Sequence, residues 1–137
     1  MAVKYEDLEL AYDFVNSGPY GDHSALLNRS TGQIYWSSES GDLDEISEAM
    51  WESDDAVEIP HKEDLDLGNR LVFRFVDSCA PDHYGRVRDM FGSRGAYARY
   101  KEFLASKGLL EKWYAYEADA QERALRDWAG ESGIEVT

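Results

Sequence analysis

The chain of 137 residues is long enough for one folded domain, and its 43% apolar and 13% aromatic residues are sufficient for a hydrophobic core. Its net charge of −14 argues against phosphate-rich nucleic acids and acidic membranes as partners. No stretch approaches the roughly 18 apolar residues of a membrane span, no signal peptide is recognisable, and Cys79 is the only cysteine, so we expect a soluble cytoplasmic protein without disulfides.

The N-terminal part of the chain predicts one helix and a small sheet. Apolar side chains share one helical stripe over residues 5–16. Residues 24–37 predict a β-hairpin in which Gly32 takes the positive φ of the turn. Residues 56–60 alternate apolar and acidic side chains and stop at Pro60, which predicts a short strand at a sheet edge.

An acidic run over residues 38–55 separates the hairpin from this strand and contains no Lys or Arg. It lacks the spacing of carboxylates around a glycine that calcium loops require. We therefore predict a solvated loop or a short helix that rests on the core through apolar residues at helical spacing.

The next helix is predicted to be capped by Asp64 or Asp66 and to carry Cys79 on its apolar face, where a thiol acts as a small hydrophobe. Residues 71–76 also have the composition of a strand. The apolar period extends over about four turns, which is longer than a typical strand, so we favour a helix there.

The C-terminal part predicts three more helices. Pro81 begins the first, Ser93 caps the second, and residues 107–109 have the form of a Schellman stop before the third. Gly130 is the predicted C′ residue of the last helix, and residues 134–136 could add a final strand.

These elements predict a single α+β domain over residues 1–137, with about five helices and an antiparallel sheet of three or four strands. The hairpin at 24–37 and the strand at 56–60 build the sheet, and 134–136 is the optional fourth strand. The last two helices form a C-terminal helical hairpin.

Several segments spread over nearly the whole chain resemble the bacterial uncharacterised protein family numbered 0158. The most specific are the helix start Arg94-Gly95-Ala96-Tyr97 and the restart Gly108-Leu109-Leu110 followed by Trp113. The other matching segments are residues 25–29, 31–32, 35–36 and 65–72. The family has no assigned activity, so the resemblance implies no catalytic residues.

No catalytic or cofactor motif is found in the sequence. His23, His61 and His83 each stand alone in their segments, although His61 lies close to several carboxylates, and none has the spacing of a zinc hydrolase. There is no Gly-x-Ser-x-Gly elbow and no phosphate loop. We expect neither a cofactor nor a metal, and a metal site assembled across segments is the less favoured alternative.

The basic stretch at residues 86–101 carries the candidate binding residues Arg88, Arg94, Tyr97 and Arg99. Free amides at a helix N-terminus, with guanidinium groups and a phenol nearby, suit a carboxylate or phosphate. The favoured alternative is that these cations pair with the acidic half of the protein.

The excess of negative charge lies entirely in the N-terminal half. Residues 1–66 hold 3 Lys and Arg against 17 Asp and Glu, and residues 67–137 hold 11 of each. Our first functional hypothesis is a non-enzymatic cytoplasmic binding or regulatory module whose acidic half engages a basic protein partner. The alternative is a small-anion-binding protein or enzyme at the Arg94 and Tyr97 helix start, and the simplest reading of the charge is solubility alone.

Overall fold

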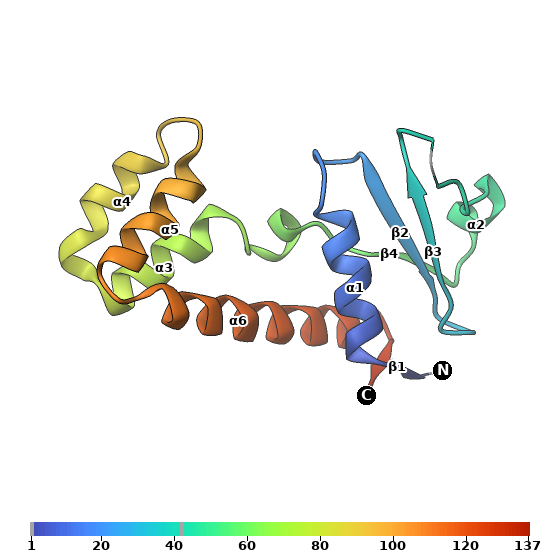
Figure 1. Cartoon of the computed structure of the whole chain (residues 1–137). Helices are drawn as coiled ribbons and strands as arrows, with labels where there is room; N and C mark the ends of the chain where they lie inside the picture. The colour runs from blue at the N-terminus through green and yellow to red at the C-terminus, as the bar shows by residue number, and fades with distance from the viewer. Residues whose placement is uncertain (1, 42) are drawn as a thin grey trace. The chain divides into compact units, whose positions relative to one another are not determined.

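A computed structural model describes residues 2–41 and 43–137, and it confirms the predicted α+β fold class. These residues form six α-helices, a three-stranded antiparallel sheet and a small parallel pair of strands (Figure 1). The chain divides into two compact units. Unit 1 is the chain up to Leu65 together with Glu122–Thr137, and unit 2 is Asp66–Gln121. A single domain over residues 1–137 stays a prediction.

The sheet of unit 1 has the order β3-β2-β4, from strands β2 (His23–Asn28), β3 (Ile34–Ser38) and β4 (Ala56–Glu58). Both pairings are antiparallel, with Leu26 of the central strand opposite Tyr35 and Glu58. The hairpin predicted at 24–37 and the edge strand predicted within 56–60 are therefore confirmed. Gly32 has a φ of 75°, as its place in the turn requires.

Helix α1 (Tyr5–Val15) packs against β2 and supplies the helical layer of unit 1 (Figure 1). Its buried side chains are those of the predicted apolar stripe: Tyr5, Leu8, Ala11, Tyr12 and Val15. The long helix α6 (Leu110–Glu131) contributes its last turns to unit 1, where Leu125 and Ala129 are fully buried.

The chain ends of unit 1 pair with each other. Strand β5 (Glu135–Val136) forms within the predicted segment 134–136, but it pairs in parallel with β1 (Ala2–Val3) and not with the antiparallel sheet. The predicted C′ residue Gly130 is wrong, because Gly130 lies inside α6 and Gly133 has the left-handed φ of 76°. The amide of Ile134 donates to the carbonyl of Ala129 over 2.8 Å, which closes the helix one turn later than predicted.

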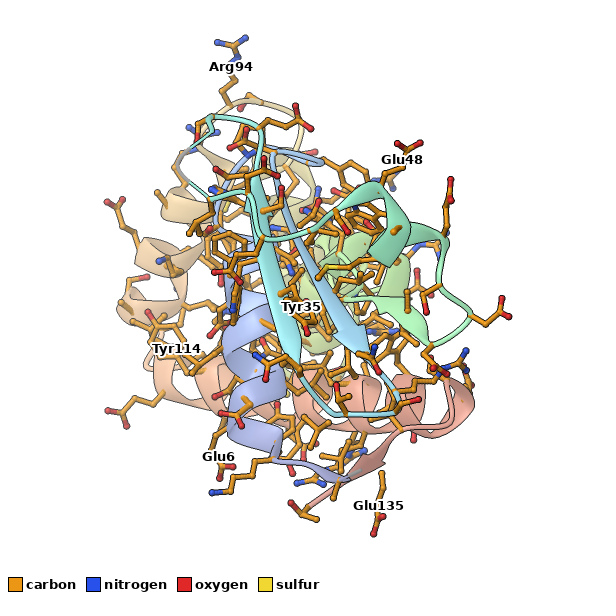
Figure 2. All side chains as sticks on the ribbon, turned by 90° about the vertical axis from the view of Figure 1, so that its right-hand side faces the viewer. Glu6, Tyr35, Glu48, Arg94, Tyr114 and Glu135 are labelled. Atoms are coloured by element: carbon orange, nitrogen blue, oxygen red, sulfur yellow. The ribbon has the colours of Figure 1, made fainter. Side chains whose placement is uncertain are left out.

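The acidic run contains the short helix α2 (Glu48–Glu52), which is capped by Ser47 through a hydrogen bond from the amide of Met50. Ile46, just before this helix, is the residue of the run that reaches the core. Carboxylates of unit 1 project outward, as Glu6, Glu48 and Glu135 show in Figure 2. Asp42 of this predicted loop lies outside the described residues.

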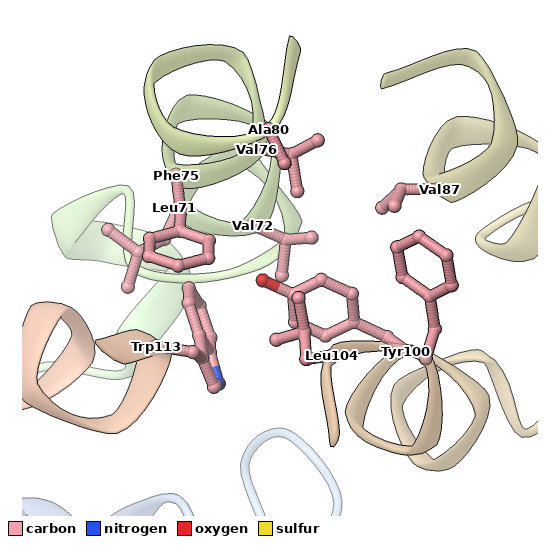
Figure 3. Packing of buried hydrophobic residues seen from close by; sticks show 10 residues of the cluster. Leu71, Val72, Phe75, Val76, Ala80, Val87, Tyr100, Leu104 and Trp113 are labelled. Atoms are coloured by element: carbon pink, nitrogen blue, oxygen red, sulfur yellow. The ribbon is translucent and has the colours of Figure 1, made fainter. Parts of the chain in front are cut away.

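Unit 2 is built from α3 (Asn69–Cys79), α4 (Tyr84–Met90), α5 (Ala96–Ser106) and the first turns of α6. The contested segment 71–76 lies inside α3, so the helix prediction is confirmed. A short 3₁₀ helix, η2 (Pro81–His83), precedes α4 and has Pro81 in its first turn. Figure 3 shows the buried cluster that holds these helices together: Leu71, Val72, Phe75, Val76, Ala80, Val87, Tyr100, Phe103, Leu104 and Trp113.

Two predicted helix caps in this region are wrong. Helix α3 has Gly68 at its N-cap and no side-chain cap, while Asp66 takes a left-handed φ of 57° and its carboxylate accepts from a guanidinium. Helix α5 has Gly95 at its N-cap, with a φ of 73°, in place of Ser93. The carboxylate of Asp64 instead accepts from the amide of His61, and the hydroxyl of Ser93 accepts from Arg99.

The predicted Schellman stop between α5 and α6 is confirmed. Gly108 has a φ of 71°, and the amide of Leu109 donates to the carbonyl of Leu104 over 2.8 Å. The amide of Gly108 bonds the carbonyl of Ala105 over 3.2 Å, which completes the motif.

Candidate functional site

The division into units sharpens the charge asymmetry. Unit 1 has 5 Lys and Arg against 20 Asp and Glu, whereas unit 2 has 9 against 8. Unit 1 therefore carries a net charge of −15 and unit 2 a net charge of +1. Such a concentrated field attracts cationic groups and repels anions over a distance of about one Debye length, roughly 8 Å in physiological salt.

The cations of the basic stretch 86–101 have different surroundings within unit 2. Arg86 and Lys101 lie over aromatic rings, with their charged groups 4.7 Å and 5.0 Å from the ring centres. Arg88 and Arg94 are exposed, and Figure 2 shows Arg94 extending outward. Among the described carboxylates of unit 2, none forms an ion pair with any of these four cations.

Arg99 closes the loop before α5. Its Nη2 donates to the hydroxyl of Ser93 over 2.7 Å and lies 3.4 Å from the carbonyl oxygen of Met90. The guanidinium therefore holds the loop whose left-handed residue, Gly95, starts the helix. This gives Arg99 a structural role within unit 2.

Tyr97 also has partners within unit 2. Its hydroxyl donates to a carboxylate oxygen of Glu117 over 3.0 Å and accepts from the indole N–H of Trp113 over 3.1 Å. Burial is the main cause that raises the pKa of Tyr97 to about 12, and the charge of Glu117 adds to it. The neighbouring carboxylate would oppose an anion bound at this phenol.

Of the four predicted binding residues, Arg94, Tyr97 and Arg99 lie around the start of α5, and Arg88 lies on α4. Tyr97 and Arg99 are engaged with protein groups, and Arg88 and Arg94 remain open to solvent. A small-anion site at this helix start stays a prediction.

Unit 1 contains a cavity of about 310 Å³, which we call the His61 pocket. Its walls come from the end of α1, the loop before β2, the start of β2, the exit of β4, the 3₁₀ helix η1 (Lys62–Leu65) and the last turns of α6. The side chains that give the pocket its chemistry are Tyr20, His23, Glu58, His61, Asp64 and Trp128. The pocket lies at the small end of the range of about 300–1,000 Å³ for ligand sites.

Backbone hydrogen bonds fix the segment that carries His61. The amide of Ile59 donates to the carbonyl of Ala25 over 2.9 Å and extends the ladder between β4 and β2. The amide of Lys62 donates to the side-chain oxygen of Asn16 over 2.9 Å, and the amide of His61 donates to a carboxylate oxygen of Asp64 over 3.0 Å. Asp64 thus shapes the turn in place of capping α3.

His61 is a buried polar residue, only 9% exposed, at the wall of this pocket. The amide of Glu63 donates to its Nδ1 over 3.4 Å, and Nε2 has no hydrogen-bond partner among the described residues. The ring of Tyr20 lies against the imidazole, with 4.4 Å between the ring centres. Tyr20 is itself 66% exposed, so one face of this aromatic pair is open to a ligand.

The electrostatics of the pocket are negative. Glu58 and Asp64 line it, and no Lys or Arg is found among the described lining residues. Partial burial raises the pKa of Glu58, and the nearby charge of Asp64 raises it further. Asp64 is also the main cause of a raised pKa at Tyr20. Two carboxylates that repel each other favour a cation between or beside them.

Sequence reasoning missed this pocket because its walls come from four separate stretches of the chain. The only local signal is the clustering of His61 with Glu63 and Asp64, which the sequence shows but cannot place opposite Tyr20 and Trp128. Within residues 2–41 and 43–137, no group of three or more His, Cys, Asp or Glu side chains is placed to hold a metal ion.

Comparison with protein-family models, with curated proteins and with solved structures gave no match. The resemblance to family 0158 therefore stays a prediction. No helix in the described part of the chain is both long and apolar enough to cross a membrane.

Proposed function

We propose that the protein is a non-enzymatic binding or regulatory module of the cytoplasm, and that unit 1 engages a basic protein partner. The observation that carries this proposal is the net charge of −15 on unit 1 beside +1 on unit 2. Solubility requires no such segregation, because acidic residues spread over both units would serve it equally well.

Exposed apolar side chains on the same unit support a protein as the partner. Leu10, Tyr20 and Trp51 are 63%, 66% and 40% exposed, and all three belong to unit 1. Aromatic side chains rimmed by charge are typical of protein interfaces, where the charges accelerate association and the rings supply affinity.

A capture experiment tests the proposal, with the full chain as bait at about 50 mM and about 500 mM salt. One variant replaces four exposed acids of unit 1 with glutamine: Glu6, Glu39, Glu48 and Glu135. A matched control removes four exposed acids of unit 2 as amides: Asp77, Asp82, Glu102 and Glu111. Both variants change the net charge equally.

We expect the bait to retain a basic protein at low salt and to lose most of it at high salt. The unit 1 variant should retain about tenfold less, and the unit 2 control should resemble the unaltered protein. Equal losses in the two variants, or no salt-sensitive partner at all, would reject the proposal.

The alternative is a small-anion site at the start of α5. It is supported by Arg88 and Arg94, which are exposed and form no ion pair with the described carboxylates of unit 2. Phosphate should then raise the melting temperature of the protein, and Arg94→Ala should abolish that rise. An Arg74→Ala variant, changed at another arginine of unit 2, should keep it. If phosphate leaves the melting temperature unchanged, the alternative fails.

A further inference from the structure

We propose that the His61 pocket binds the cationic side chain of a Lys or Arg residue of a peptide, together with a carbonyl oxygen of that peptide. This inference rests on the proposed function, since it names the group by which a basic partner would be held. Three properties of the pocket support it: its charge, its aromatic walls and the unused nitrogen of His61.

The charge of the pocket selects a cation. Glu58 and Asp64 line the pocket, and no Lys or Arg is among the described residues that line it. A phosphate or carboxylate would be repelled there by two negative charges, so we exclude anionic ligands. The raised pKa of Glu58 is relieved when a cation binds beside it.

The aromatic walls suit a long cationic side chain. Tyr20 is 66% exposed and its ring lies tilted against that of His61, while Trp128 forms another part of the wall. Ammonium and guanidinium groups bind over such rings, and the aliphatic stem of Lys or Arg packs along them. A volume of about 310 Å³ fits one side chain and leaves no room for a large cofactor.

His61 adds a hydrogen-bond donor to the site. Because Nδ1 accepts the amide N–H of Glu63, the neutral ring carries its proton on Nε2. This N–H has no acceptor among the described residues, although the residue is only 9% exposed. This N–H is therefore free to donate to a ligand that brings an acceptor into the pocket. A peptide supplies a carbonyl oxygen along with its cation, and a simple polyamine does not.

The test uses the full chain and short model peptides, followed by NMR at the indole N–H of Trp128 and the ring of His61. The probes are acetyl-Ala-Lys-Ala-amide, acetyl-Ala-Arg-Ala-amide, the neutral acetyl-Ala-Gln-Ala-amide and spermidine. We expect both cationic peptides to shift the two signals, spermidine to bind more weakly and the neutral peptide to leave them unchanged.

The variant Glu58→Gln combined with Asp64→Asn should weaken peptide binding about tenfold, because asparagine keeps the acceptor for the amide of His61 but both charges are lost. Glu48→Gln, an exposed change outside the pocket, is the matched control. His61→Phe keeps a ring against Tyr20 and removes the N–H, so it should abolish the preference for peptides over spermidine. Backbone amide spectra establish that each variant is folded.

Absence of shifts with either cationic peptide, or equal shifts with the neutral one, would overturn the inference. Equal binding of spermidine would overturn the role of His61. This test can fail while the proposed function holds. If a basic partner is captured and the pocket variants retain it fully, unit 1 binds a basic partner but the His61 pocket is not its binding site.

Discussion

We expect replacement of tyrosine by phenylalanine to have opposite effects on stability at two positions of unit 2. Tyr100 is fully buried, and its hydroxyl has no hydrogen-bond partner among the described residues. In Figure 3 this hydroxyl points into the middle of the apolar cluster. The hydroxyl of Tyr97, by contrast, bonds both Glu117 and Trp113. Phenylalanine at either position removes one oxygen and leaves the ring in place.

The magnitudes follow from the cost of an unsatisfied polar group. A buried hydroxyl without a partner costs about 1–3 kcal/mol, so Tyr100→Phe should raise the free energy of unfolding by about 1–2 kcal/mol. Tyr97→Phe leaves the indole N–H of Trp113, a residue only 1% exposed, without its acceptor. It should therefore lower the free energy of unfolding by about 1–3 kcal/mol.

Urea denaturation followed by tryptophan fluorescence measures both changes, and the comparison is valid if the slope of free energy against urea is unchanged. The double variant should show the sum of the two effects minus any coupling through Trp113, whose ring centre lies 5.2 Å from that of Tyr100. A loss of stability in Tyr100→Phe as large as that in Tyr97→Phe would refute the reasoning, because it would show that the Tyr100 hydroxyl is satisfied.

Three further predictions test the local structure. The pKa of Tyr97 is raised from 10 to about 12, mainly by burial. The stability that neutral Tyr97 contributes is therefore complete below pH 10 and is lost as the pH rises to about 12. Circular dichroism at increasing pH should detect this loss. Gly108→Ala should destabilise the protein by about 1 kcal/mol, because Gly108 has a left-handed φ of 71°. Gly130 lies inside α6 with no atom near the position of a Cβ, so Gly130→Ala should stabilise the protein by up to about 1 kcal/mol. The same urea assay measures both changes. Arg99→Ala should speed amide hydrogen exchange in the loop around Ser93 while leaving the core of unit 2 protected. Unchanged exchange in that loop would show that the Arg99 guanidinium does not hold it.

The helices and the antiparallel sheet could be predicted from the sequence because their signals are local. The period of apolar residues placed α3 over the contested segment 71–76, and the same signal gave the buried stripe of α1. Gly32 and Gly108 were predicted at turns that need a positive φ, a requirement that the backbone imposes within four or five residues.

The helix ends that were predicted wrongly depend on distant contacts. Gly130 has the residue type of a C′ position, but α6 continues to Glu131. The chain takes its left-handed residue at Gly133, directly before Ile134, which is only 7% exposed. Asp66 has the chemistry of an N-cap, yet its carboxylate accepts from Arg70 and the helix begins after Gly68. Local propensity is a weak signal when burial of a later residue favours a different end.

The candidate site shows the same limit. The sequence by itself determined the fold class, the excess of acid and the presence of an isolated histidine beside carboxylates, since each is a property of composition or of neighbouring residues. Only the tertiary structure decided that β1 pairs with β5 and that Tyr20, His61 and Trp128 share one pocket wall. These residues are far apart in the chain, and burial of the apolar faces of α1, β2 and α6 brings them together.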